Sequence, residues 1–138
     1  MYINKKIITF AYLTILISCS SVEKKLIPTY NKGGYRINIL KTNLNDSNIE
    51  GKIFNFANGK PISHSEVIIG CLKYKTSSDG EYSFKLDNLS DTFFIKASSI
   101  GYKTVETDFI NLNEKSKMRI DFYLIEDDRP LINCEGKN

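Results

Sequence analysis

The feature of this sequence that most constrains its fold is an alternation of apolar and polar residues with a period of two. It is clearest near the C-terminus, where Met118, Ile120, Phe122 and Leu124 are separated by single, mostly more polar residues. Shorter stretches repeat the pattern at residues 66–74, 81–86 and 93–98. Because successive side chains of a strand point to opposite faces of its sheet, each stretch predicts a strand with one buried face.

The segments between these stretches indicate the same fold class. None of them has the length and the periodicity of a crossover helix. Aromatic and β-branched residues are plentiful, whereas alanine and proline are scarce. The sequence therefore predicts an all-β fold, an antiparallel Greek-key β-sandwich of about seven strands.

Two turns are marked by residues whose backbone preferences suit a reversal of the chain. At the first, Gly59 gives the sharp reversal and Pro61 fixes φ ahead of the next strand. At the second, Asp79 and Gly80 are expected to join two paired strands. Gly80 is free to take positive φ, and the Asp79 carboxylate is expected to accept hydrogen bonds from backbone amides of the loop.

A third reversal is predicted at Gly101, which lets Tyr102 lay its ring over the end of the core. Three further tyrosines, Tyr74, Tyr82 and Tyr123, fall on predicted strands. We expect at least two of these four tyrosines to belong to the core, because they lie on apolar faces.

The N-terminus carries a leader. Lys5 and Lys6 precede an apolar run at residues 7–17, and small Ser18 precedes Cys19. This order is typical of a bacterial secretion signal. The run is shorter than the roughly 20 residues of a membrane-spanning helix. The alternatives are an uncleaved anchor helix, a buried core helix and an ordinary secreted protein without lipid.

The last four residues of the leader, Leu16-Ile17-Ser18-Cys19, resemble a lipobox, the cleavage and lipidation site of bacterial lipoproteins. The resemblance implies that Cys19 becomes the first residue of the mature protein. Its thiol would carry a diacylglyceryl group and its amine an acyl chain such as palmitate. A single lipid chain binds a membrane only marginally, so this larger number of chains would anchor the protein stably. The membrane, reached through this lipid, is thus the first expected partner.

The chain is expected to divide into four parts. The signal peptide covers residues 1–18, and a tether with a possible extra strand covers residues 19–48. The sandwich covers residues 49–126, and a polar tail covers residues 127–138.

Charge excludes one class of partner. Lys5 and Lys6 lie in the leader, and without them the 19 basic and 16 acidic residues of the chain leave a nearly neutral body. Such a body has no electrostatic footprint for nucleic acid or for acidic lipid.

Two cysteines remain besides Cys19. Cys71 continues the apolar alternation of Val67 and Ile69, so we expect it to be a small buried residue, whereas Cys134 lies in the polar tail. We favour two free thiols, with a disulfide between Cys71 and Cys134 as the alternative.

Five landmarks occur in a recognisable order over residues 49–125. They are Gly51-Lys52-Ile53-Phe54, Gly59-Lys60-Pro61-Ile62, Ser65-Glu66-Val67-Ile68-Ile69, residues 76–84 and residues 99–104. Together they resemble the carboxypeptidase regulatory-like domain, a transthyretin-like or prealbumin-like β-sandwich. Ser65, where that family prefers alanine, and Cys71 depart from its pattern. The resemblance implies an accessory role in folding, spacing or partner contact, as in extensions of outer-membrane receptors, without chemistry.

Candidate chemistry is sparse. His64, the only histidine, lies between two serines at a strand start and is read as a surface residue, because no orienting group is evident. Residues 76–81 hold too few acids for a calcium loop, so no metal or cofactor is expected. The acidic run at residues 126–128 is typical of a solvated end.

The sequence therefore predicts a non-enzymatic, lipid-anchored module at the bacterial cell envelope, on the periplasmic or surface face of the outer membrane, with an envelope protein as its partner. A carbohydrate-binding surface lipoprotein is one alternative. It requires a row of three exposed, coplanar rings, where only Phe94 and Tyr123 are expected. An enzyme with an unrecognised site is the other alternative.

Overall fold

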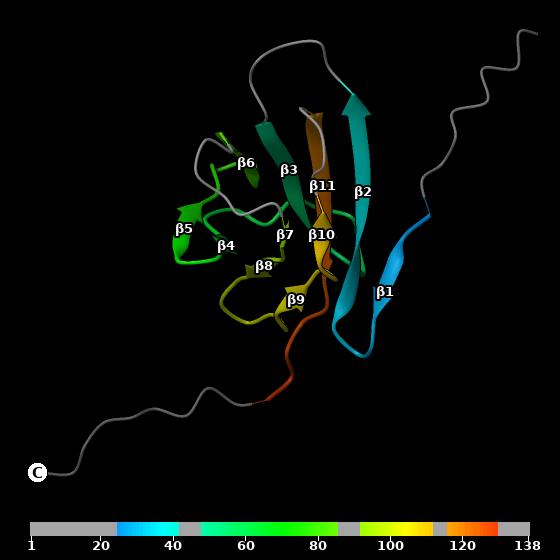
Figure 1. Ribbon diagram of the computed structural model, residues 1–138. Helices are drawn as coiled ribbons and strands as arrows, with labels where there is room; N and C mark the ends of the chain where they lie inside the picture. The colour runs from blue at the N-terminus through cyan, green and yellow to red at the C-terminus, as the bar shows by residue number, and fades with distance from the viewer. Residues whose placement is uncertain (1–24, 42–47, 86–91, 112–115, 130–138) are drawn as a thin grey trace, which may run out of the picture.

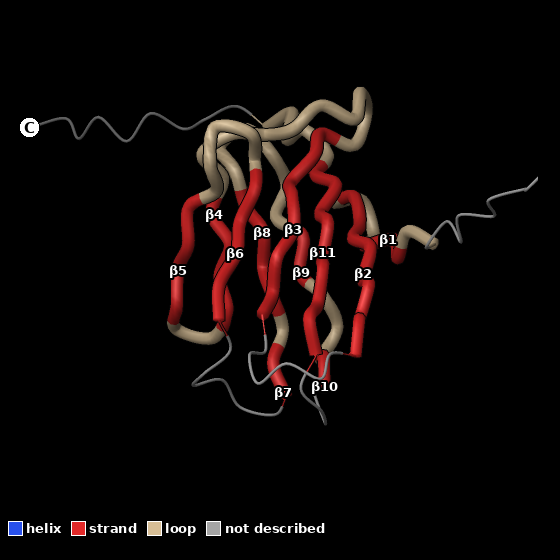
Figure 2. The backbone as a smooth tube through the Cα atoms, turned by 90° about the horizontal axis from the view of Figure 1, so that it is seen from above, coloured by secondary structure: helices blue, strands red, loops and turns tan. Residues whose placement is uncertain are grey.

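A computed structural model describes residues 25–41, 48–85, 92–111 and 116–129 of the chain (Figure 1). These residues form strands and loops and no helix, which confirms the predicted all-β class (Figure 2). The strands are β1 (Ile27–Thr29), β2 (Gly33–Lys41), β3 (Asn48–Asn55), β4 (Glu66–Ile69), β5 (Leu72–Lys75), β6 (Glu81–Lys85), β7 (Thr92–Phe93), β8 (Ile95–Ser98), β9 (Val105–Glu106), β10 (Ile110–Asn111) and β11 (Ser116–Leu124).

The first layer is a five-stranded sheet in the order β1-β2-β11-β3-β6. Its central strand β11 is antiparallel to β2 and parallel to β3, so that Met118 lies opposite Ile39 on one side and Ile49 on the other. The parallel pair corrects the prediction of a wholly antiparallel sandwich. A parallel pair requires a long connection. Here the chain passes through β6 and the whole second layer before it returns as β11.

The second layer consists of a four-stranded sheet, β5-β4-β8-β9, and the short pair β10-β7. Phe94 alone separates β7 from β8, so these two segments form one interrupted strand. The described residues thus contain more strand segments than the predicted seven, partly because the outer strands of this layer are broken into short pieces.

The core lies between the two layers and follows the period-two pattern. Met118, Ile120, Phe122 and Leu124 of β11 are all fully buried. Burying a side chain of this size stabilises the fold by about 1.5–3 kcal/mol. The opposite layer contributes a matching set of buried residues, namely Val67, Ile69, Phe93, Ile95, Ala97, Val105 and Ile110.

The sandwich begins earlier in the chain than the predicted boundary at residue 49. Strand β2 pairs with β11 over nine residues, and the ring of Tyr35 is only 3% exposed. Its hydroxyl donates a hydrogen bond to the Asp108 carboxylate in the second layer, at 3.2 Å. The segment that was expected to be a tether or an extra edge strand is therefore an interior strand, and the short β1 forms the edge.

Cys71 is exposed, which corrects the expectation that it is buried. The predicted continuous strand at residues 66–74 is a hairpin, because Gly70 adopts a φ of +56° and turns the chain between β4 and β5. Cys71 lies in this turn as an exposed, free cysteine, and Leu72 after it is 48% exposed. Cys134 lies outside the described residues.

The turn at Asp79 and Gly80 differs from its prediction in two respects. It connects β5 to β6, which belong to different layers and do not pair with each other. The Ser77 hydroxyl, rather than the Asp79 carboxylate, accepts the amides of Asp79 and Glu81, at 3.2 and 3.1 Å. Gly80 has a φ of +72°, and a Cβ there would lie 2.8 Å from the Ile62 carbonyl oxygen.

This arrangement predicts different effects for two neighbouring substitutions. Ser77→Ala removes the acceptor of two amides, so we expect the free energy of unfolding to fall by about 0.5–1.5 kcal/mol. Asp79→Ala is the matched control and is expected to change it by less than about 0.5 kcal/mol. Urea unfolding of both variants measures the difference. A larger loss of unfolding free energy for Asp79→Ala than for Ser77→Ala would show that the Asp79 carboxylate is the acceptor, as the sequence predicts.

Candidate functional site

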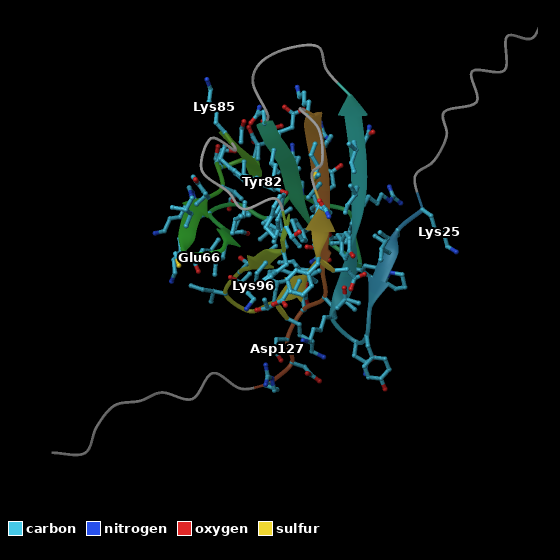
Figure 3. All side chains as sticks on the ribbon, viewed as in Figure 1. Lys25, Glu66, Tyr82, Lys85, Lys96 and Asp127 are labelled. Carbon is cyan, nitrogen blue, oxygen red and sulfur yellow. The ribbon has the colours of Figure 1, made fainter. Side chains whose placement is uncertain are left out.

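Four residues singled out in the sequence lie at one end of the sandwich, which we call the loop end; they are Gly59, Pro61, Gly101 and Tyr102. It comprises residues 30–32, 55–63, 99–104 and 125–129. Pro61 forms a bridge with Phe54, and Tyr102 forms one with Glu126. In Figure 3 the labelled Asp127 lies at this end and Lys85 at the opposite one. Cys19 lies outside the described residues.

The buried side chain of Asn55 organises the loop end. Its Nδ2 donates to the Tyr102 hydroxyl at 3.2 Å and to Glu126 Oε1 at 2.8 Å. Its Oδ1 accepts the backbone amides of Ala57 at 2.8 Å and Asn58 at 3.3 Å. One side chain thus holds three separate segments together. An asparagine at the start of a turn was the available signal, but its long-range partners could not be read from the sequence.

Glycines shape the same end. Gly59 has a φ of +67° and donates its amide to the Asn55 carbonyl, while Gly101 has a φ of +82°. Tyr102 after it is half-buried and packs against the core cluster.

A hollow of about 570 Å³ opens at the loop end, beside the turn between β1 and β2. Within the described ranges, the side chains of Lys32 and Lys103 have no ion-pair partner there, whereas Arg129 pairs with Asp127. The hollow is lined by Tyr30, Asn31, Lys32, Tyr102, Lys103, Thr104, Asp128 and Arg129. A second hollow of about 310 Å³ shares Tyr102 and lies beside Asn55, Lys60 and Pro61. The loop end therefore presents rings and lysines to its surroundings.

The Arg129 guanidinium donates hydrogen bonds to the Asp127 carboxylate, with Nε 2.9 Å from Oδ1, and lowers the pKa of Asp127 from 3.8 to about 2. Stabilisation from a lowered pKa is present above pH 3.8 and is lost as the pH falls towards 2. We expect Arg129→Gln to return the Asp127 pKa towards its ordinary value. Lys103→Gln, which removes a more distant charge, should raise it less. An NMR titration of the carboxyl carbon measures both, and equal shifts would contradict the assignment.

The outer face of the five-stranded sheet carries ion pairs between neighbouring side chains. Lys117 Nζ lies 2.9 Å from Glu50 Oε2, and Lys52 Nζ lies 3.4 Å from Glu81 Oε1. Arg119 Nε lies 3.2 Å from Asp121 Oδ2. Exposed pairs of this kind contribute little to stability, typically below about 1 kcal/mol. An open hollow of about 350 Å³ lies among Glu50, Gly51, Ser77, Glu81, Tyr82, Ser83 and Arg119.

Aromatic rings on this face stack on one another and do not form a platform. The centroids of Phe54 and Tyr123 are 5.2 Å apart with an angle of 18° between the ring planes, and Arg36 covers the Tyr123 ring at 5.0 Å. Coplanar neighbouring rings would need a wider spacing, so these rings overlap face to face. Phe94 lies in the other layer and contacts Phe109 edge-on. The described residues therefore do not supply the three coplanar rings that a carbohydrate platform requires.

His64 is exposed, has a φ of +51°, and donates its amide to the Ser77 carbonyl at 3.3 Å. Across residues 25–41, 48–85, 92–111 and 116–129, no group of three or more His, Cys, Asp or Glu side chains is arranged to hold a metal ion.

Comparison with known proteins returned no match, either among protein-family models or among curated proteins. The resemblance to the carboxypeptidase regulatory-like domain stays a prediction. Within the part of the chain that the structure describes, no helix has the length and apolar character needed to cross a bilayer.

Proposed function

We propose that this chain is a non-enzymatic, lipid-anchored β-sandwich of the bacterial cell envelope that serves as a structural or protein-binding accessory module. The observation that carries the proposal is the short distance in sequence between the lipobox-like cysteine and the first strand. Cys19 precedes β1 at Ile27 by eight residues. A folded body that begins so soon after Cys19 suits a domain held close to a membrane by lipid.

The outer face of the five-stranded sheet is the proposed contact surface for the partner protein. Its charges of both signs lie in a defined order across β11, β3 and β6, and complementary charges give an interface specificity. Its hollow beside Arg119 offers space for a partner side chain. The carboxypeptidase regulatory-like resemblance supports this accessory role.

The lipid is tested by feeding a labelled fatty acid to cells that express the full chain. The wild-type protein is expected to carry the label and to fractionate with membranes, and Cys19→Ser to lose both properties. Cys71→Ser is the matched control, because Cys71 is a free, exposed cysteine outside the leader, and it should keep both. Label retained by Cys19→Ser would refute lipidation at this position.

The partner is tested with two charge swaps that keep each ion pair. The double variant Lys52→Glu/Glu81→Lys reverses a pair on the proposed surface, and Lys96→Glu/Glu106→Lys reverses a pair on the other layer, where the atoms are 3.1 Å apart. We expect recovery of a cross-linked envelope protein to fall about tenfold or more with the first swap only. No recovered protein, together with binding to a glycan array, would favour the carbohydrate alternative instead.

A further inference from the structure

Three exposed large hydrophobic side chains of the described residues lie at the loop end, whereas Ile27, Ile39, Leu72 and Phe109 are exposed elsewhere. Tyr30 and Ile100 are the two most exposed large hydrophobic residues, each at 88%, and Phe56 is 47% exposed. Tyr30 and Tyr102 line the same hollow, and Ile100 belongs to the turn that the Tyr102 amide closes onto the Ser99 carbonyl. Single exposed hydrophobic residues are ordinary, but several at one end of a molecule mark an interaction surface.

The polar residues around them suit the interface of a phospholipid bilayer. Lys32 and Lys103 lie beside the two tyrosines, and Asp128 lines the same hollow. Neither lysine has an ion-pair partner within the described ranges, although Lys103 is close enough to Asp127 to lower the pKa of that carboxyl. Tyrosine is enriched at the boundary between membrane and water, where its ring meets apolar chains and its hydroxyl meets water. Lysine places its apolar stem against the membrane and keeps its ammonium group among the phosphates.

The length of chain between Cys19 and the sandwich limits how far the body can lie from the membrane. Lys25 lies six positions after Cys19, and a fully extended chain of six residue steps spans about 20 Å. Lys25 lies on the β1 side of the molecule, and β1 then runs towards the turn that holds Tyr30 (Figure 3). The five positions from Lys25 to Tyr30 cover about 17 Å when extended, which is less than the span of the tether. The tether is therefore long enough to bring Cys19 to the level of Tyr30.

We infer that the loop end lies against the phospholipid bilayer, with Tyr30 and Ile100 among the lipid headgroups and Lys32 and Lys103 facing the phosphates. This inference rests on the proposed lipid at Cys19. It places the strands of the sandwich upright on the membrane and leaves the outer face of the five-stranded sheet open to a partner protein.

The two ends of the sandwich can be probed separately. Strand β4 pairs with β8 so that Glu66 lies opposite Ser98 and Ile69 opposite Ile95. Cys71, just after Ile69, therefore lies at the end opposite to Ile100. A fluorophore on Cys71 in a Cys134→Ser background reports the far end. A second variant carries the fluorophore at position 128, through Asp128→Cys in a Cys71→Ser/Cys134→Ser background. This label reports the loop end, since Asp128 is exposed and lines the hollow.

The experiment uses the mature lipidated chain in vesicles of phosphatidylethanolamine and phosphatidylglycerol that contain a lipid with a quencher on its headgroup. We expect stronger quenching at position 128 than at position 71, because the four residues of β4, about 13 Å of strand, lie between Cys71 and the loop end. The additional changes Tyr30→Ser and Ile100→Ser should remove most of this difference. Leu72→Ser, which removes an exposed hydrophobic residue at the other end, should leave it unchanged.

The intact mass of the same samples separates the two proposals. A mass without the lipid shows that the proposed anchoring of Cys19 is wrong. A mass with the lipid, combined with equal quenching at both positions or stronger quenching at position 71, overturns the orientation while the anchor stands. Quenching at position 128 that persists unchanged without Tyr30 and Ile100 also overturns it.

Discussion

Replacing Gly51 with alanine is expected to lower the free energy of unfolding by about 3 kcal/mol or more, because the new methyl group has no space in a packed core. A Cβ at this position would overlap the carbonyl oxygen of Ile120 and lie 2.7 Å from the Tyr82 hydroxyl oxygen. The overlapped atom belongs to the backbone of the central strand β11, so it cannot move without disturbing the whole sheet. Guanidinium unfolding, followed by circular dichroism, measures the loss.

Gly59→Ala is the matched control. Gly59 has a φ of +67° and no atom within 4 Å of a Cβ built there, so alanine adds only backbone strain of about 1–2 kcal/mol. A loss at Gly51 no larger than that at Gly59 would show that β3 and β11 are not packed as described.

Replacing Tyr82 with phenylalanine is expected to lower the free energy of unfolding at neutral pH by about 1–3 kcal/mol, because it leaves a buried carbonyl without its donor. The pairing of β3 with β11 is interrupted between Glu50 and Ile53. In this interval the Tyr82 hydroxyl reaches across from β6 and donates to the Ile120 carbonyl oxygen at 2.7 Å. The Lys52 amide donates instead to the Asp121 carboxylate at 3.1 Å.

The same hydroxyl gives the fold a dependence on alkaline pH. Burial raises the pKa of Tyr82 well above 10.0, and the nearby Asp121 carboxylate adds to the rise. The stabilisation from a raised tyrosine pKa is fully present below pH 10 and is lost as the pH rises above it, because the unfolded chain releases the proton first. Tyr82→Phe should lower stability at neutral pH and flatten its decline above pH 10.

Tyr74→Phe is the control for both effects. Tyr74 stacks on Phe84 with centroids 4.7 Å apart, and Tyr82 stacks on the same ring at 6.0 Å. Among the residues that the structure describes, the Tyr74 hydroxyl has no hydrogen-bond partner. It should change stability by less than about 0.5 kcal/mol and leave the alkaline decline intact. Equal effects of the two changes would rule out a special role for the Tyr82 hydroxyl.

The alternation of apolar residues was sufficient to predict the buried face of β11, since Met118 through Leu124 needed no knowledge of distant partners. The same rule failed at Cys71, because the alternation continues through a turn and Gly70 was the only local sign of the break. Period-two patterns thus predict which face is buried but not where a hairpin interrupts the strand.

The two glycines that begin β2 differ from their prediction for another reason. Gly33 and Gly34 lie in the segment 19–48 that the sequence predicts to be a tether, whereas they are buried and permit close packing. A Cβ at Gly33 would overlap the Tyr123 carbonyl oxygen, and one at Gly34 would lie 2.5 Å from the Ile27 carbonyl oxygen. Flexible linkers and tightly packed strands can both require glycine, so composition alone did not distinguish them.

The loop end was predicted only in its parts. Turn residues such as Gly59 and Gly101 are recognisable locally, but the contacts of Asn55 with Tyr102 and Glu126 join positions 47 and 71 residues apart. Hydrogen bonds over such separations depend on the completed topology. The hollow beside Asn55 and Tyr102 could therefore be found only in the structure.

The central place of β11 in the five-stranded sheet has a consequence for biogenesis. If the chain is exported from its N-terminus as proposed, β2 and β3 reach the far side of the membrane well before the strand that separates them. Both keep an unpaired edge until β11 has been translocated, so the five-stranded sheet cannot close before that strand arrives. On the same proposal, a product truncated before β11 would carry the lipid and yet be unable to complete the five-stranded sheet.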